Sequence, residues 1–376
     1  MRIVAGTVGF VLLLAVLWDT FETIILPRSV MREIRIARLF YRNLWFCWSV
    51  TARRLRNGRR REVFLSSFGP LSLPLLIGVW AICLIFSFAL IHWSLGSALH
   101  DSEAPNRRHV AFGTDMYMSG TTFFTLGFGD VTPRTGLGRF LAVTEAGVGF
   151  GFLAIVIGYL PVLYQSFSRR EVGISLLDAR AGSPPSAGEL LRRHSQAHSL
   201  GALEDELRDW ERWAADLLES HLSYPVLAYY RSQHDRESWL AALTMILDAA
   251  AVLQLEFDGA PAWQRSVIWQ AKMTYAVARH AAVDLALVLG MSPEPPEPDR
   301  LSDAGCTRLG EILKSAGMKF VDERAAAQRL QQLRADYEPY VNALATRLLL
   351  DLPPWFVEGS TPDDWQMSVW DSEHHF

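Results

Sequence analysis

Hydrophobic residues gather into three long runs in the first half of the chain, over residues 3–26, 71–95 and 137–164. A helix needs about 20 apolar residues to cross a hydrocarbon core ~30 Å thick, so each run is long enough to span a membrane. Asp19 and Glu22 interrupt the first run only near its end, where an interface or a neighbouring helix can accommodate them. The pattern predicts an all-α membrane protein with three spans.

The first of these segments, residues 1–27, is predicted to be an N-terminal transmembrane helix. The alternative is a cleaved signal peptide. Only Arg2 supplies a basic start, and no small-x-small cleavage site follows Val16 to Asp19. The sequence therefore favours a helix that stays in the membrane.

The second half of the chain is more polar, and its hydrophobic positions recur with the helical period. Trp210, Trp213 and Leu217, for example, lie on one face of a helix. We expect an all-helical domain over 171–351 and a loose tail over 352–376. The expected helices cover residues 187–198, 202–222, 236–257, 262–290, 302–317 and 322–351.

Arginines crowd residues 28–61, between the first two hydrophobic runs. On a helix the first five lie within roughly a third of the circumference, given 3.6 residues per turn. This profile predicts, within 28–66, an interfacial helix whose basic face binds anionic lipid headgroups, and the alternative is a solvated basic linker. The five are Arg28, Arg32, Arg35, Arg38 and Arg42, and the opposite face carries Ile36, Ala37, Phe40, Tyr41, Leu44 and Trp48.

The arginines also predict the orientation of the chain. We expect the protein in the cell (inner) membrane, which the chain crosses several times. By the positive-inside rule, the segment 28–61 faces the cytoplasm. The run 71–95 then leads outward, and 137–164 returns to Arg169 and Arg170. We expect the N-terminus outside and the helical half inside.

Between the second and third runs lies the stretch FGTDMYMSGTTFFTLGFGD, residues 112–130. Non-helical backbone at membrane depth survives only where protein or water covers its polar groups. A selectivity filter uses that constraint, because its carbonyls replace the water around an ion. Gly127 and Gly129 can carry successive carbonyls to one side, since glycine reaches positive φ without steric clash. The stretch is therefore predicted to be a re-entrant pore helix and filter.

TLGFGD, residues 125–130, resembles the TVGYGD signature of the potassium-channel family, and residues 117–122 look like its pore helix. The resemblance implies a pore-loop channel whose pore domain covers 67–170, with outer helix 70–95, pore helix 113–124, filter 125–130 and inner helix 137–167. It also implies a homotetramer, because one chain supplies a quarter of the carbonyl ring. The ion-binding residues would be Thr125, Leu126, Gly127, Phe128 and Gly129.

The filter departs from the family pattern behind its ion-facing backbone. Phe128 replaces the usual Tyr, and Thr121 stands where some members carry a Glu facing Asp130. Asp130, Thr121 and Thr122 are the expected filter supports. We expect K⁺ as the permeant ion, with no other metal and no organic cofactor. A weakly selective monovalent cation channel is the alternative.

The third hydrophobic run is rich in glycine and contains a carboxylate. Gly149 lies twenty-two positions after Gly127, which matches the family's gating hinge, and close helix packing is the alternative. Pro161 and Tyr164 would lie near the inner mouth. Glu145 is expected either to pair with a Thr or Ser of the pore helix or to be protonated, in a structural role.

The helical half shows no spacing of nucleophile, base or metal ligands, so we expect no enzyme. His194 and His198 stand four apart, but without further ligands a solvated face is favoured over a metal site. A cluster of Tyr224, Tyr229, Tyr230 and Trp239 is expected to be helical core. The net charge of −4 gives no argument for nucleic acid, and Cys47, Cys83 and Cys306 form neither a disulfide framework nor a metal pattern.

We expect this half to serve assembly and gating, with a cytoplasmic ligand that the sequence does not identify. The other hypothesis is a membrane receptor or signalling protein whose function resides in the helical half.

Overall fold

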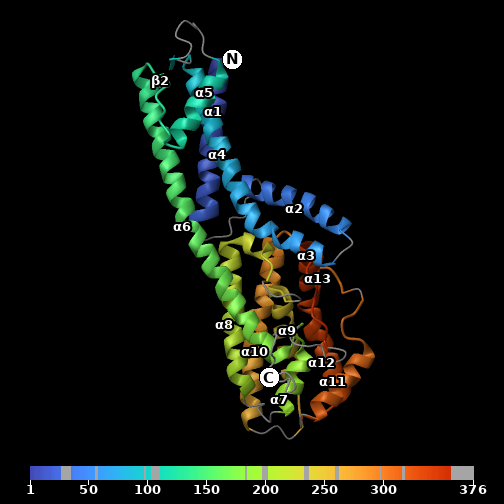
Figure 1. Ribbon diagram of the computed structural model, residues 1–376. Helices are drawn as coiled ribbons and strands as arrows, with labels where there is room; N and C mark the ends of the chain where they lie inside the picture. The colour runs from blue at the N-terminus through green and yellow to red at the C-terminus, as the bar shows by residue number, and fades with distance from the viewer. Residues whose placement is uncertain are drawn as a thin grey trace, which may run out of the picture. The chain divides into compact units, whose positions relative to one another are not determined.

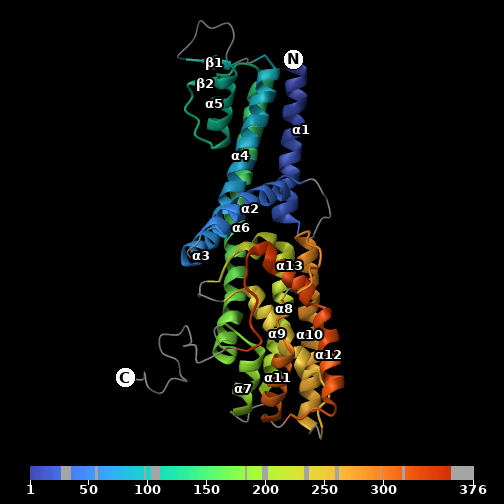
Figure 2. The ribbon, with the colours of Figure 1, turned by 90° about the vertical axis from the view of Figure 1, so that its right-hand side faces the viewer.

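The computed structural model describes residues 1–26, 35–55, 58–96, 99–102, 111–182, 184–196, 202–232, 237–258, 262–296, 298–315 and 318–356. The chain divides into two compact units, Met1–Tyr164 and Gln165–Phe376. We call them the membrane unit and the helical unit (Figures 1 and 2). Most of the described chain is helical, as the sequence predicts.

Three helices in the described chain are long and apolar enough to cross a membrane, within Arg2–Ile25, Gly58–Ser94 and Gly136–Ala181. The predicted spans are therefore present as helices. The elements that begin in the membrane unit are α1 (Arg2–Thr20), a π-helical turn (Phe21–Ile25), α2 (Ile36–Arg54), α3 (Gly58–Ser66), α4 (Phe68–Ser94), β1 (Leu99–Asp101), α5 (Phe112–Phe123), β2 (Val131–Pro133) and α6 (Gly136–Ala181).

Helix α1 packs lengthwise against α4 (Figure 2). A Cβ added at Gly9 would lie 2.7 Å from the backbone oxygen of Ser87, and one at Gly6 would lie 2.6 Å from Oγ of Ser94. Small residues at helix contacts are typical of membrane proteins, where close backbone approach replaces the hydrophobic effect. The two glycines therefore fix how closely α1 and α4 approach.

The acids at the end of the first span are buried against neighbouring elements. Asp19 Oδ2 accepts hydrogen bonds from Trp80 Nε1 on α4 at 2.8 Å and from the backbone N–H of Ala37 on α2 at 3.1 Å. Glu22 accepts from Trp18 Nε1 at 2.7 Å. The expectation that a neighbouring helix accommodates these acids is confirmed.

Arg35 differs from its predicted place on the basic helix face. It precedes α2 in extended conformation, with φ −133° and ψ 139°. Its Nε lies 3.5 Å from Oε2 of Glu22 and 3.9 Å from Oδ1 of Asp19. The buried acids attract this arginine, so it faces protein instead of headgroups.

The remaining basic segment forms two helices, α2 and α3. The predicted apolar side of α2 is buried or half-buried: Ala37 belongs to the core of the membrane unit, with Ile36, Phe40 and Tyr41 against it. Trp48 stacks on Phe64 of α3 at 4.5 Å between ring centroids. Arg38, Arg42, Arg53, Arg54, Arg59 and Arg60 are exposed, and Arg28, Arg32 and Arg56 lie outside the described residues.

Helix α6 extends beyond the predicted inner helix of 137–167, because it continues to Ala181. The further helices of the helical unit are α7 (Ala187–Gln196), α8 (Leu203–Ser223), α9 (Trp239–Leu253), α10 (Ala262–Val288), α11 (Asp303–Ser315), α12 (Glu323–Ala335) and α13 (Glu338–Leu348), with a 3₁₀ turn at Pro225–Tyr229.

The prediction of one helix over 322–351 is wrong. The chain forms α12 and α13, separated at Asp336 and Tyr337, where φ is −128° at Tyr337. Pro339 explains the break, because proline lacks an N–H and its ring clashes with the carbonyl four residues earlier in a continuous helix.

Helix α9 is the centre of the helical unit, and all of its residues are buried. Of the expected aromatic cluster, Trp239 belongs to the core and Tyr229 packs against that core, whereas Tyr224 and Tyr230 are half-buried. A continuous apolar surface around a helix is typical of one enclosed by others. Helices α7, α8, α10, α12 and α13 contact it.

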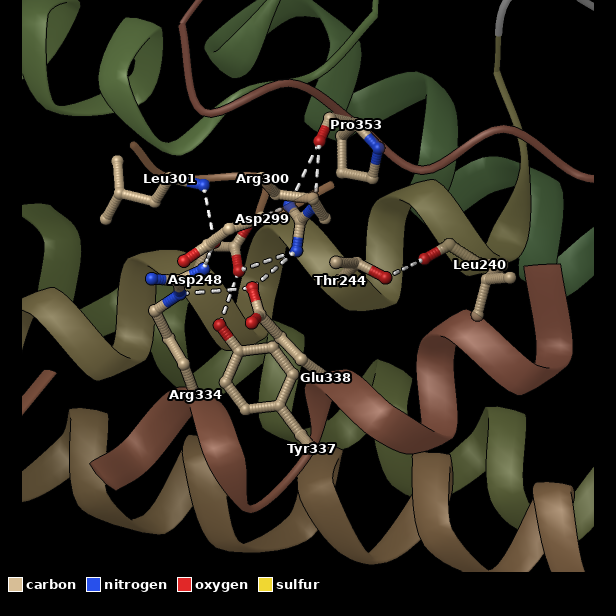
Figure 3. Close-up of polar contacts among 10 residues, drawn as sticks. All are labelled: Leu240, Thr244, Asp248, Asp299, Arg300, Leu301, Arg334, Tyr337, Glu338 and Pro353. Carbon is tan, nitrogen blue, oxygen red and sulfur yellow. Dashed lines mark hydrogen bonds and ion pairs between the residues drawn. The ribbon is translucent and has the colours of Figure 1, made fainter. Parts of the chain in front are cut away.

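A network of buried charges crosses this core (Figure 3). Arg300 donates to Asp248 at 2.5 Å, and Tyr337 O–H donates to the same carboxylate at 2.5 Å. Arg334 Nε donates to Glu338 at 3.1 Å and also pairs with Asp299. Burial and the adjacent Asp248 raise the pKa of Tyr337, which keeps its hydroxyl a donor.

Candidate functional site: the loop after helix α5

Helix α5 ends in a motif that turns the chain sharply into the predicted filter. The Leu126 N–H donates to the Thr121 carbonyl at 2.8 Å, and the Thr125 N–H donates to the Thr122 carbonyl at 3.0 Å. These two bonds, together with the left-handed backbone of Thr125, form a Schellman motif. The motif satisfies the last carbonyls of α5 and starts the loop at Thr125.

Thr125 occupies the left-handed position, with φ 56°. Glycine is usual there, and a β-branched residue in this region is an outlier. Such a conformation costs about 1–3 kcal/mol and persists only where its surroundings enforce it. The loop therefore begins at a strained residue held by two backbone hydrogen bonds.

The sign of φ alternates along the loop, since it is positive at Thr125, Gly127 (58°) and Gly129 (80°) and at no residue between them. A Cβ at either glycine would meet no atom of this chain within 4 Å. Leu126 and Phe128 are 56% and 66% exposed. Backbone conformation, not space within the chain, thus requires glycine at 127 and 129.

The far end of the loop is attached to a small hairpin. The backbone oxygen of Asp130 accepts bonds from N–H and Oγ of Ser102, each at 3.0 Å. Strand β1 pairs with β2 antiparallel, with Asp101 opposite Val131. In the described part of the chain, the Asp130 carboxylate has no hydrogen-bond or ion-pair partner.

The two expected threonine supports contact the loop through their backbone. Thr121 accepts from Leu126 and, at 3.4 Å, from the Gly127 N–H. Its hydroxyl donates to the Met118 carbonyl at 2.9 Å, within α5. Thr122 is half-buried and accepts from Thr125. These backbone hydrogen bonds could not be predicted from the side chains of Thr121 and Thr122. Their role as filter supports stays a prediction.

Gly149 lies where α6 meets the end of α5. A Cβ added there would be 2.0 Å from the backbone oxygen of Phe123 and 2.9 Å from its carbonyl carbon. Helix α6 is unbroken through this position. The contact supports the close-packing interpretation, and the hinge stays a prediction. Pro161 lies within the same helix, and Tyr164 is 65% exposed.

Glu145 contacts a hydroxyl of helix α5, which is one of the two expectations stated for it, and its protonation stays open at this point. Its Oε1 contacts Oγ of Ser119, and its Oε2 lies 3.5 Å from Nε2 of His92 on α4. All three side chains are buried. His92 was not among the predicted residues, although a polar residue within an apolar run is a signal for it.

In the helical unit, α6 is locked by Arg170. The buried guanidinium donates to the carbonyls of Leu227 and Tyr230, each at 2.9 Å, and to the Glu171 carboxylate. A Cβ at Gly173 would lie 2.1 Å from the ring of Trp213 on α8. The final turns of α6 are therefore part of the core of this unit.

His221 lies beside that arginine. Its Nδ1 is 2.8 Å from the Leu217 carbonyl, and its Nε2 is 3.4 Å from Nη1 of Arg170. Burial, together with the positive charge of Arg170, lowers the pKa of His221 to about 3. The imidazole is therefore neutral, with Nδ1–H donating to Leu217.

His194 is buried, so the expectation of a solvated face is wrong for this residue. Burial disfavours its protonation, but hydrogen bonds to Glu206 and to the Leu190 carbonyl outweigh burial and raise the pKa of His194. His198 lies outside the described residues, and no group of three metal-ligating side chains exists within the described ranges.

Residues 76–165 match the family model of the ion channel family, which is not enzymatic. Over 268 residues the chain is 24% identical to the uncharacterized membrane protein YdjJ of Bacillus subtilis (strain 168). This match covers 69% of this chain and 75% of YdjJ.

Two further matches are shorter. The protein LctB of Geobacillus stearothermophilus is 32% identical over 84 residues, and LctB of Bacillus caldotenax is 33% identical over 84 residues. Each match spans 21% of this chain and 62% of the relative. No solved structure matches. Residues 76–165 therefore form an ion channel domain within a membrane protein.

Proposed function

We propose that the protein is a potassium-selective channel in which four copies of the chain surround a conducting axis. The observation that carries the proposal is the loop Thr125–Asp130, which follows a short helix between two membrane-length helices and alternates the sign of φ. Alternation allows the carbonyls of Thr125 to Gly129 to face one side, where they can replace the hydration of K⁺.

The exposure of Leu126 and Phe128 supports assembly. Large apolar side chains that are more than half exposed in a single chain are suited to contact with another copy. Closed symmetric rings are the common solution for identical subunits, and a carbonyl ring needs several loops around one axis.

Reversal potentials test the selectivity. The full chain is reconstituted in planar bilayers with unequal K⁺ and Na⁺, and we expect reversal near the K⁺ equilibrium potential. Reversal near the Na⁺ value would contradict potassium selectivity. Gly127→Ala places a side chain at φ 58° and is expected to abolish K⁺ preference, whereas Gly136→Ala, at an unhindered position at the start of α6, serves as the control.

A weakly selective cation channel is the second candidate, because Phe128 has no hydroxyl and the Asp130 carboxylate lacks a partner in the described chain. Under that candidate, both glycine variants leave the ion preference unchanged. The same recordings therefore separate the two functions.

We propose that the helical unit gates the pore from the cytoplasm. The support is Arg170, which attaches α6 to the core of that unit through the carbonyls of Leu227 and Tyr230. Arg170→Met is expected to alter open probability, whereas Arg169→Met, at an exposed neighbouring position, is not. Equal open probability in both variants would contradict this role.

The arginines of α2 and α3 suit a cytoplasmic membrane surface. Both ends of this pair of helices connect to membrane-length helices, and Arg38, Arg42, Arg53, Arg54, Arg59 and Arg60 are exposed. Each basic residue near an anionic bilayer contributes about 1 kcal/mol. We expect these helices to bind anionic lipid more strongly than neutral lipid. In this arrangement the N-terminus lies outside. Equal binding to both lipids would contradict the proposal that α2 and α3 lie on the membrane surface.

A further inference from the structure

The carboxyl group of Glu145 is enclosed by three helices. Glu145 on α6 and Ser119 on α5 have no exposed surface, and His92 on α4 is 3% exposed. No other basic side chain is buried in the described part of the membrane unit. Helix α5 also carries a buried carboxyl group, that of Asp115, one turn before Ser119.

The hydrogen atoms around Ser119 can be counted. Its Oγ lies 2.8 Å from the Ile85 carbonyl oxygen on α4 and also contacts Oε1 of Glu145. A serine hydroxyl has one hydrogen to donate and two lone pairs that accept. The Ile85 carbonyl can only accept, and so can an ionised carboxylate. A single hydrogen therefore cannot serve both contacts.

We propose that Glu145 is a carboxylic acid that carries its proton and donates it in a hydrogen bond to Ser119. Ser119 then donates to Ile85, and each of the two contacts of the serine oxygen has one hydrogen. An ionised Glu145 would leave two acceptors in contact without a hydrogen between them.

The position of His92 is consistent with this assignment. Its Nε2 lies 3.5 Å from Oε2 of Glu145, beyond the 2.7–3.2 Å range of normal N–H···O bonds. A buried ion pair needs excellent geometry and further hydrogen bonds to offset desolvation. A neutral carboxylic acid avoids that penalty inside a membrane.

The proton makes Glu145 a positioning residue for the filter. Its hydrogen-bond chain joins α6 to α5 and α5 to α4, at Ser119 on the helix that ends at the loop of Thr125. This role rests on the proposed channel function, whereas the protonation of Glu145 does not.

Infrared spectroscopy on the full chain in lipid tests the protonation. Wild type is expected to show a carbonyl stretching band of a protonated carboxylic acid that Glu145→Gln removes. Glu62→Gln, at an exposed site on α3, is the control and should leave the band. If Glu145→Gln removes no such band, the proposal is overturned.

Potassium flux tests the positioning. A Gln amide donates and accepts like a carboxylic acid, so Glu145→Gln should keep flux within about twofold of wild type. Glu145→Leu and Ser119→Ala lose the chain and should reduce flux by about tenfold. Loss of flux in Glu145→Gln would overturn the positioning role. Absence of flux in wild type would refute the channel function. The infrared measurement would still test the protonation of Glu145, because it does not depend on flux.

Discussion

The membrane unit and the helical unit are both helical bundles, but different contacts hold them together. In the membrane unit, glycines bring backbones together: Gly9 lies against the Ser87 carbonyl and Gly149 against the Phe123 carbonyl. In the helical unit, Gly173 lies against an indole ring, and the core contains paired charges.

The difference follows from the surroundings of each unit. Lipid gives helices no hydrophobic reason to associate, so close packing and a few hydrogen bonds must hold them. A bundle surrounded by water, as predicted for the helical unit, gains from burying apolar surface, and its buried charges are paired with one another. Three changes test this comparison, from the largest expected effect to the smallest.

Replacing Arg300 by Met should affect the helical unit most. It leaves Asp248 buried beside only the Tyr337 hydroxyl, and removing one partner of a buried pair costs about 3–5 kcal/mol. Thermal unfolding of the full chain in detergent measures the loss. Arg192→Met, in an exposed pair with Glu189, is the control and should cost less than about 1 kcal/mol. Equal losses would show that the network is not essential.

Gly149→Ala should be the most damaging small change in the membrane unit. The new methyl group meets backbone that cannot rotate away, and overpacking typically costs about 1–3 kcal/mol, so we expect the upper end of that range. Gly151→Ala, where no atom of the chain lies within 4 Å, is the matched control. Thermal stability and K⁺ flux are measured for both. A stable, conducting Gly149→Ala protein would mean that the approach of α6 to α5 is not tight.

Acid should weaken the helical unit through His221. Its pKa is about 3 in the fold and 6.5 when unfolded. Below pH 6.5 the unfolded chain binds a proton that the folded chain does not, so stability falls as pH decreases from 6.5 toward 3. Between pH 7 and 5 this amounts to ~2 kcal/mol.

The variant His221→Gln should lose that part of the pH dependence, whereas His280→Gln, at an exposed site on α10, should keep it. Thermal unfolding at pH 5 and pH 7 gives the comparison. An unchanged pH dependence in His221→Gln would show that His221 is not the buried group responsible.

The sequence predicted the elements that depend on local pattern. The three apolar runs became helices, of which only the third continues well beyond its expected end, and the filter motif lies in a loop after a short helix. The break between α12 and α13 was not predicted, because the hydrophobic period is regular across it, although Pro339 was a signal for it.

What depends on tertiary contact could not be predicted. Glu145 was expected to pair with a pore-helix hydroxyl, yet neither His92 nor the Ile85 carbonyl could be identified before the helices were placed together. Likewise, Arg35 belonged to the basic pattern, and only the buried positions of Asp19 and Glu22 show why it leaves that face.

Thr125 has a final consequence for how the loop behaves over time. Its backbone is held in a form that favours glycine by the two bonds that end α5. Loosening these bonds would let φ return to negative values and release about 1–2 kcal/mol. The backbone of Thr125 therefore favours relaxation of the loop whenever the two bonds at the end of α5 open.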